Sequence, residues 1–389
     1  MKTATLKANF ASLLIFVLSL GFALPVLAQH DGENDHEHQR HEDEEHDEPF
    51  DAGEMIMHHI ADAHEIHIIG DFAIYLPVIV YSEANGLDIF SSSHFYHGEK
   101  HGTYTAENGE EKNYHYYAYK DYVMFHEHIY LAGDEEELMI NPETGEATNA
   151  SVLDFSITKS VAGVFLTCIL LLLIFGSVAR GYKKRKDEAP KGLQSFMEPL
   201  ILFIRDEVAI PSIGSAARAE RFMPFLLSIF FFIWIANMLG LIPFIGGFNI
   251  TGTLSVTLVL AALVFIITTV NGNKHYWTHI LWPSGVPLPI KFILVPIEFA
   301  SIFIKPIVLM VRLTANITAG HIILLAFVSL ALIFGQQSAA AGYGVGAGSV
   351  LFMVFMFFIE LLVAFLQAYV FTLLAALYFG DAVQEGHHT

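Results

Sequence analysis

The sequence predicts an all-α polytopic membrane protein with about five membrane helices, preceded by a small exported module that is β-rich or irregular. The chain has 389 residues, 54% of them hydrophobic, and its mean hydropathy is +0.49. Long apolar runs recur from about residue 158 to residue 380, whereas acidic residues gather before residue 150. A high apolar fraction arranged in long uncharged runs is typical of membrane proteins rather than of soluble cores.

The formal net charge of −20 belongs almost entirely to one region. Residues 29–150 contain 29 Asp and Glu against 4 Lys and Arg, whereas residues 151–389 contain 11 against 14. So acidic a segment argues against nucleic acid as a partner. The single cysteine, Cys168, lies in an apolar run, so the chain has no disulfide framework.

The first residues have the pattern of a secretory signal. Lys2 and Lys7 precede an apolar stretch, and "VLAQ" offers a cleavage site before Gln29. We therefore predict a signal peptide over residues 1–28, with an uncleaved signal anchor as the alternative. Either alternative exports the segment that follows.

Two exported segments are predicted next. Residues 29–50 have almost no apolar side chains, so we predict a disordered acidic and histidine-rich segment. Nothing in it has the spacing of a closed zinc site, and we predict no metal site and no cofactor. Residues 51–150 form a small module, because aromatic and β-branched runs alternate with turn signals such as "ANG" and "NGEE". Within it, Met55–Phe72 fits either a short amphipathic helix or the approach to a strand.

The membrane domain is predicted over residues 151–389. Apolar runs predict helices over about 158–181, 221–244 and 252–272, with an amphipathic cytoplasmic segment over about 191–210. The cluster "RGYKKRK" follows the first helix, and the positive-inside rule places it in the cytoplasm. Two apolar blocks remain, at about 291–335 and 349–380. The first is too long for one upright span, and periodicity alone leaves open one long tilted helix or two short ones.

Four formally charged residues interrupt these two blocks: Glu298, Lys305, Arg312 and Glu360. Each costs about 2.5–3.5 kcal/mol at the centre of a membrane helix. Such residues therefore face protein or water and are candidates for function. Structural alternatives are that Lys305 snorkels to the surface, and that Glu360 forms an inert ion pair with Arg312.

The spacing of these residues groups them on helix faces. Glu298, Lys305 and Arg312 stand seven residues apart, which places them on one face, and Asn316 lies one turn beyond Arg312. His321 falls on the opposite side of the same helix.

On the second block, Glu360 and Gln367 share a face. Glutamate and histidine exchange protons, whereas the arginine guanidinium stays protonated. A fixed cation flanked by titratable groups predicts an ion path with a barrier. The alternative for Asn316 and Gln367 is ordinary hydrogen bonding between helices, and for His321 a packing role.

The segment "PIEFASIFIKPIVLMVRLTANITAGHIILL" closely resembles the signature helix of the F-type ATP synthase subunit a family. Its R-L-x-x-N-x-x-A-G core falls on Arg312, Leu313, Asn316, Ala319 and Gly320. The segment "FLQAYVFTLLAALY" resembles the final helix of that family, with its glutamine at Gln367. The resemblance covers roughly residues 158–380.

The resemblance implies a fold and a set of partners. The last two helices would form a long tilted hairpin around a rotating ring of subunit c. The other partners would be the subunit b stalk, the rest of the complex and the lipid bilayer. The chain would be a non-catalytic membrane subunit of the bacterial inner membrane, with a periplasmic N-terminal region and a cytoplasmic C-terminus. It would carry protons, although the ring decides between H⁺ and Na⁺.

The resemblance also implies roles for the charged residues. Arg312 would face the ion-binding carboxylates of the ring and separate an inlet from an outlet. Glu298 would lie toward the cytoplasmic exit, with Lys305 as possible support. The half-channel open to the periplasm would be lined by four residues: Asn316, His321, Glu360 and Gln367.

Two departures from the family pattern stand out. Many bacterial members carry Glu where this chain has His321 and His where it has Glu360, so this pair is exchanged as in the mitochondrial form. The exported extension over about 29–150 has no role in the family core.

Two other function classes compete with this one. The histidines suggest a divalent-metal transporter. Such a transporter needs several ligands that converge within the membrane, but the predicted membrane helices contain a single histidine, His321. A receptor with an exported sensor is the other, although we expect no cytoplasmic signalling domain.

Overall fold

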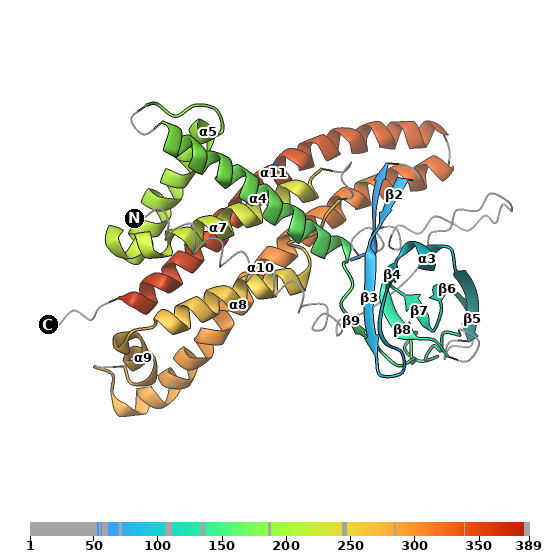
Figure 1. Cartoon of the computed structure of the whole chain (residues 1–389), viewed down its shortest axis with the longest axis horizontal. Coiled ribbons are helices and arrows are strands. Elements are labelled where there is room, and N and C mark those ends of the chain that lie inside the picture. The colour runs from blue at the N-terminus through green and yellow to red at the C-terminus, as the bar shows by residue number, and fades with distance from the viewer. Residues whose placement is uncertain are drawn as a thin grey trace.

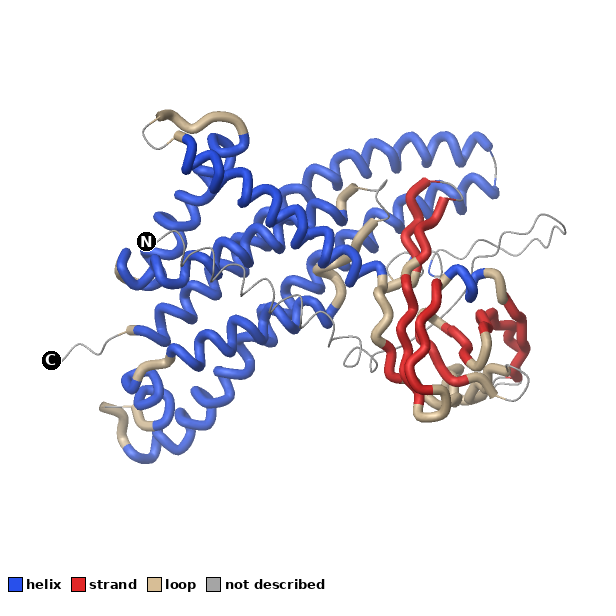
Figure 2. The backbone as a smooth tube through the Cα atoms, in the orientation of Figure 1, coloured by secondary structure: helices blue, strands red, loops and turns tan. Residues whose placement is uncertain are grey.

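The computed structural model describes residues 61–384 apart from 70–71, 106–110, 134–136, 186–187, 243–246, 284 and 338, together with residues 53 and 56. The predicted signal peptide and the predicted disordered segment lie outside the described residues. The rest forms a layer of long helices with a β module at one end, where the first membrane helix begins (Figure 1). Figure 2 shows that strands are confined to this module.

Five helices in the described part are long and apolar enough to cross a membrane. They are α4 (Lys159–Lys184), α7 (Ala216–Gly240), α8 (Leu254–Asn271), α10 (Leu288–Gln337) and α11 (Ala339–Val383). This confirms the predicted fold class. Shorter helices connect them: α5 (Leu193–Phe203), the π-helical turn η2 (Ile204–Ala209), α6 (Ile210–Ile213) and α9 (Lys274–Leu281).

Local sequence sets where several of these helices begin. The Thr158 hydroxyl accepts a hydrogen bond from the Val161 N–H at the start of α4, and Ser215 does the same for α7. The Asn273 side chain caps α9 by accepting from the Tyr276 N–H at 2.8 Å. Such caps satisfy amide groups that have no partner within the helix.

The long apolar block at the start of the final hairpin is one helix. α10 runs for 50 residues through Pro296 and Pro306 without a break. At about 1.5 Å per residue it is about 75 Å long, more than twice the thickness of the hydrocarbon core. It must therefore be strongly inclined in a bilayer. α11 returns alongside it, so the two form the predicted hairpin (Figure 1).

α7 forms the centre of the helical layer. It packs against α4 and α11, and Phe230, Phe231 and Ile233 are fully buried along it. The rings of Phe230 and Phe365 meet edge to face at 5.7 Å between centroids. α8 packs against α10, so the hairpin is supported along one side by two shorter helices.

The β module contains three antiparallel sheets. β1 (Glu65–Ile69) pairs with β2 (Phe72–Tyr75), and β3 (Pro77–Ser82) lies between β4 (Gly86–Ser91) and β9 (Leu153–Asp154). The third sheet is a meander of β5 (Glu99–Thr105), β6 (Glu111–Tyr119), β7 (Tyr122–Phe125) and β8 (His128–Leu131). A one-turn helix, α3 (Ser93–Tyr96), precedes this meander.

The module has its own apolar core, in which Phe95, Tyr122 and Met124 are almost completely buried. Within the stretch Met55–Phe72, residues 65–69 form strand β1. Of the two alternatives for this stretch, the approach to a strand is therefore correct at these residues.

A strained turn organises the junction between the module and the helices. β7 and β8 are joined by the two residues His126 and Glu127, whose φ angles are 48° and 63°. A type I′ hairpin turn needs positive φ at both positions, which normally favours Gly or Asn. This turn brings the Glu127 carboxylate to His64, which lies just before β1. The carboxylate oxygen is 3.1 Å from the backbone N of His64 and 3.2 Å from its Nδ1.

His64 is the centre of a buried charged cluster, which we call the His64 cluster: His64, Glu127 and Asp154. Its ring is 1% exposed, and its Nε2 lies 3.7 Å from Asp154 Oδ2. Burial alone would lower the pKa of His64, but the Asp154 and Glu127 carboxylates outweigh it and raise the pKa to about 10. The imidazole therefore stays protonated at neutral pH and holds three chain segments together.

The module is packed directly onto the first turn of α4. The Lys159 N–H donates to the Ala63 carbonyl at 2.8 Å, and the Ser160 N–H donates to Asp62 at 2.8 Å. Ile66 of β1 belongs to the same buried apolar cluster as the membrane helices. The module and the helical layer are therefore joined by polar contacts and by a shared core.

Candidate functional site

Arg312 lies on an exposed face of α10, which we call its outer face. Its side chain is exposed, whereas Leu309 and Leu313 of the same helix are each 1% exposed. Within the described part of the chain, the guanidinium forms no hydrogen bond or ion pair. The phenol of Tyr378 on α11 is within electrostatic range, but no carboxylate among the described residues pairs with this permanently charged group.

Small side chains flank Arg312 on the same outer face. Ala315 and Ala319 are both exposed, and so is Asn316 one turn beyond the arginine. The neighbouring residues on this face are large and apolar, with Val308 42% and Val311 49% exposed. Small residues let another helix approach closely. The face therefore combines one charge, one amide and room for a partner helix.

Glu360 is buried where α11 meets α10. The residue is 9% exposed, and its Oε2 has no hydrogen-bond partner among the described residues. Its carboxyl group packs on the backbone of Gly320, where a Cβ would clash with Oε1 and lie 3.2 Å from Cδ. Glycine at position 320 therefore makes room for the acid. A buried oxygen without a partner is costly in a structural role, so this carboxyl group is a candidate for proton exchange.

His321 follows Gly320 and points toward a different neighbour. Gly240, at the end of α7, lies beside it: a Cβ there would be 3.5 Å from His321 Nε2, an ordinary contact distance, and 2.7 Å from the Phe248 carbonyl oxygen. The ring is half-buried and within electrostatic range of Lys159 at the start of α4. The structure thus places His321 inward, near the module, while Arg312 points outward.

Asn316 and Gln367 are the other polar residues that the sequence singled out on this side. Asn316 is exposed and Gln367 is half-buried on α11, and neither forms a hydrogen bond within the described residues. The alternative that both residues join neighbouring helices by hydrogen bonds is therefore not seen in this chain by itself. Interhelical bonds come instead from residues that the sequence did not single out. The Thr257 and Thr314 hydroxyls are 2.6 Å apart, and the Asn237 side chain on α7 donates to the Ala364 carbonyl on α11 at 3.3 Å.

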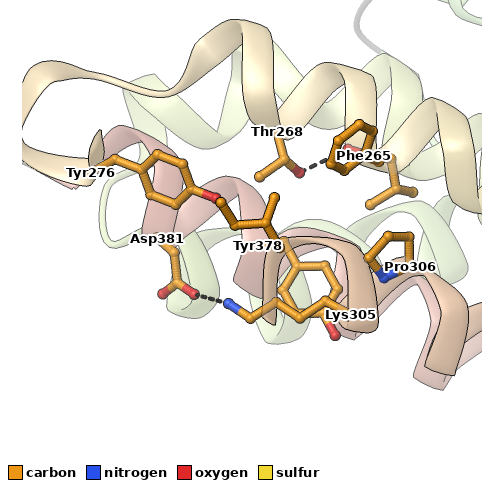
Figure 3. A pocket seen from close by; sticks show the side chains of 9 residues that line it. Phe265, Thr268, Tyr276, Lys305, Pro306, Tyr378 and Asp381 are labelled. Carbon is orange, nitrogen blue, oxygen red and sulfur yellow. Dashed lines mark hydrogen bonds and ion pairs between the residues drawn. The ribbon is translucent and has the colours of Figure 1, made fainter. Parts of the chain in front are cut away.

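Lys305 and Glu298 lie toward the other end of α10. Lys305 Nζ is 3.5 Å from Asp381 Oδ2, at the end of α11, and 5.1 Å from the centre of the Tyr378 ring. Glu298 is within electrostatic range of Tyr276 on α9. Figure 3 shows Lys305 and Asp381 pointing toward each other in a pocket beside Tyr276 and Tyr378.

Sequence reasoning missed Asp381, although the acid directly follows Gly380 at the end of the last apolar block. Lys305 and His321 are separated by 16 residues, or about 24 Å along the helix axis. The candidate residues therefore form two groups, one near each end of the central part of α10, with Arg312 between them.

Comparison with known proteins matches the helical layer to one family. The sequence model described as "ATP synthase A chain" matches residues 161–380, which is more than half of the chain. The chain belongs to this family. ATP synthase subunit a of Chloroherpeton thalassium is 42% identical over 242 residues, covering 60% of this chain and 69% of the relative. Its namesake from Chlorobium phaeobacteroides (strain BS1) is 42% identical over 241 residues, covering 60% and 68%.

The β module matches a different family. A domain of unknown function (DUF8433) matches residues 55–155. The ATP synthase A chain match begins at residue 161, inside α4, so the two matches meet at the junction where the module packs on the helices.

Membership of the ATP synthase A chain family decides against the metal-transporter and receptor interpretations. It makes the chain a subunit of the membrane part of a larger complex.

Proposed function

We propose that this chain is the stationary proton-conducting subunit of its ATP synthase. In this role two half-channels load and unload carboxylates on a ring of subunit c, and the proton flow turns the ring and drives ATP synthesis. The chain catalyses no reaction by itself. One observation carries the proposal: Arg312 is exposed on the outer face of α10 and forms no hydrogen bond or ion pair within the described residues.

The chemistry of that face favours a carboxylate as the partner. An arginine exposed to lipid is expensive, and an acid on a passing helix would relieve that cost. Ala315 and Ala319 leave room for such a helix next to the guanidinium. The guanidinium would attract the carboxylate, promote the loss of its proton and, because it cannot deprotonate, block direct passage between the two sides.

The two groups of residues supply the two half-channels. Glu360 and His321 lie near the exported module and would serve the periplasmic side, together with Asn316 and Gln367. Glu298 would serve the cytoplasmic side at the opposite end. Lys305, paired with Asp381 at 3.5 Å, would support that end rather than carry protons.

The same proposal sets the orientation and the surroundings. The chain would span the bacterial inner membrane with its N-terminal region in the periplasm and its C-terminus in the cytoplasm. Residues 151–389 would be the membrane domain and residues 51–150 the exported module, after a signal peptide over 1–28. The further partners would be the subunit b stalk and the rest of the complex.

Replacing the arginine tests the proposal. In an assembled Arg312→Ala complex, ATP-driven proton pumping should fall at least about 100-fold, as expected when a preorganised charge is removed. Pumping would be measured by quenching of a pH-sensitive dye in inverted vesicles. Arg205→Ala, on η2 beside Asp206, is the matched control and should pump normally. Normal pumping by an assembled Arg312→Ala complex would contradict the proposed role.

A further inference from the structure

Lys159 connects the exported module to the candidate proton path. It is the first residue of α4 and is 9% exposed. Three acids of the module lie within electrostatic range of its ammonium group: Asp62, Glu65 and Glu127. On the membrane side the same ammonium group is within electrostatic range of His321. One buried cation is therefore shared between module acids and the inner histidine of the path.

A series of polar groups follows the same route. The Asp62 carboxylate accepts from the Ser160 N–H at 2.8 Å, and the Ser160 hydroxyl lies 2.8 Å from the Thr253 hydroxyl. The Thr253 hydroxyl donates to the Asn249 carbonyl at 3.0 Å. The series thus leads from the module, across the first turn of α4, to the loop that precedes α8.

The series reaches α10 beside His321. The Thr318 hydroxyl on α10 donates to the Gly252 carbonyl at 3.5 Å, and Thr318 lies three residues before His321 on the same helix face. Asn249, which packs on Gly252, is 5% exposed, and its Oδ1 has no hydrogen-bond partner among the described residues. A buried amide oxygen without a partner favours water at this position.

Asp62 is suited to exchange protons where the series begins. Burial raises the pKa of its carboxyl group, while hydrogen bonds from Ser160 and Thr158 and the charge of His64 oppose the rise. A carboxyl group with a raised pKa is protonated more often near neutral pH than a solvated one. The charge of His64 keeps the carboxylate form accessible as well.

We propose that the exported module forms the outer entrance of the periplasmic half-channel and that Asp62 is its first titratable group. Asp62 takes a proton from the exported side and releases it toward His321, and so returns to its carboxylate form in each cycle. The Ser160 and Thr253 hydroxyls line the way. This inference rests on the proposed proton-conducting function.

Neutralising Asp62 tests the entrance. In the assembled ATP synthase complex, Asp62→Asn should lower ATP-driven pumping and passive proton flux about tenfold. This is less than the roughly 100-fold typical of a positioned acid or base, because water can substitute at an entrance. Asp62→Glu should retain most of the flux. Asp121→Asn is the matched control, since its carboxylate is exposed and accepts a hydrogen bond from the Asn85 side chain at 3.2 Å.

Assembly of the complex and proton flux must be measured separately for each variant. Normal flux in an assembled Asp62→Asn complex would overturn the inference. If Asp62→Asn fails to assemble, Ser160→Ala replaces it, because that variant keeps the N–H bond to Asp62 and loses only the hydroxyl. Its flux should fall several-fold, and unchanged flux would equally overturn the entrance. Normal pumping by Arg312→Ala would instead refute the underlying function.

A second, independent observation concerns three side chains on the meander sheet. Glu99 and His101 stand two residues apart on β5 and share a face, and His115 of β6 lies directly opposite His101. The two imidazole rings are 4.1 Å apart, and His115 Nδ1 is 3.6 Å from Glu99 Oε1. One donor atom from each residue lies within 4.8 Å of the other two.

This donor set fits a divalent transition-metal ion. Two imidazoles and one carboxylate are a common Zn²⁺ ligand set, and bond lengths of about 2.0–2.2 Å put tetrahedral donors about 3.4 Å apart. Small side-chain rotations would bring the three donors to that spacing. Glu99 and His101 are exposed and His115 is half-buried, so an ion could reach the site from the exported side. The geometry points to a Zn²⁺-class site at Glu99, His101 and His115, with one coordination position left for water.

Metal titration of the full-length chain tests this site. After removal of bound metal with EDTA, titration with ZnCl₂ should show one tight equivalent that is lost in both His101→Ala and His115→Ala. His97→Ala, an exposed histidine outside the cluster, should retain it and controls for other histidines in the chain. Circular dichroism of the metal-free proteins would show whether each variant folds. Equal numbers and affinities of bound Zn²⁺ in wild type and both variants would overturn the site.

Discussion

The two halves of the molecule differ in whether their charged side chains have partners within the chain. In the module, the ring of His64 is 1% exposed and has a carboxylate near each of its ring nitrogens. In the helical layer, Glu360 is buried and one of its oxygens has no hydrogen-bond partner among the described residues, while Arg312 is exposed and forms no hydrogen bond or ion pair with them. A charge with internal partners stabilises the fold, whereas a charge without them is available to another molecule or to a proton.

The same contrast appears in how glycine and strain are used. Gly320 keeps space open for Glu360, so α10 leaves room for a titratable acid on α11. The module instead accepts positive φ at His126 and Glu127, which closes the His64 cluster. The strained turn in the module therefore closes a charged cluster, whereas the glycine in the helix leaves room for a titratable acid.

The largest expected effect comes from neutralising the buried acid of the helices. Glu360→Gln should lower ATP-driven pumping by about 100-fold or more, as for a positioned acid or base. Thr372→Val is the matched control, because Thr372 is also buried on α11 but its hydroxyl donates to its own helix at Ala368. The comparison between the two halves breaks if the glutamine variant pumps at the wild-type rate.

Removing the central imidazole of the module should act on stability instead. His64→Gln leaves the Glu127 and Asp154 carboxylates facing each other, and losing one partner of such a cluster costs about 3 kcal/mol of unfolding free energy. Denaturant unfolding, followed by tyrosine fluorescence, would measure this cost. His97→Gln, at an exposed position, is the control. An unchanged unfolding midpoint for His64→Gln would show that the cluster is not structural.

Adding a methyl group at Gly320 tests whether Glu360 needs the room that the glycine leaves. Gly320→Ala places a Cβ against the acid, and overpacking of this kind costs about 1–3 kcal/mol, so pumping should fall about tenfold. Gly176→Ala on α4 is the matched control, because nothing lies within 4 Å of its Cβ position. Equal pumping by both variants would mean that the carboxyl group shifts without consequence.

The last expected effect arises from the same His64 cluster and is a pH dependence of module stability. The pKa of His64 is about 10 in the folded chain, against 6.5 for an ordinary solvated histidine. The stabilisation is therefore fully present below about pH 6.5 and is lost as pH rises toward 10. The unfolding midpoint should fall between pH 7 and pH 10 in the wild type.

His64→Gln should lack this slope. Nearby His128, whose pKa is lowered mainly by burial, titrates on the acid side and does not contribute in that range. A slope of equal size in both proteins would assign the pH dependence to another group.

The amino-acid sequence by itself determined the membrane class, the β-rich module and the candidate residues of α10. Those inferences depend on local quantities: the length of an apolar run, the cost of a charge within it, and the seven-residue spacing of Glu298, Lys305 and Arg312. A helix fixes which of its own residues share a face, so such predictions need no tertiary contacts.

Only the tertiary structure decided which groups are partnered. Local patterns do not show that Asp381 pairs with Lys305, that Gly320 makes room for Glu360, or that Glu127 closes on His64 across 63 residues. The sequence likewise left open whether the 291–335 block was one helix or two. Prolines 296 and 306 can each end a helix, but they are tolerated inside a membrane helix where neighbouring helices support the backbone. Partnership depends on packing between distant segments, and that information is absent from any single stretch of sequence.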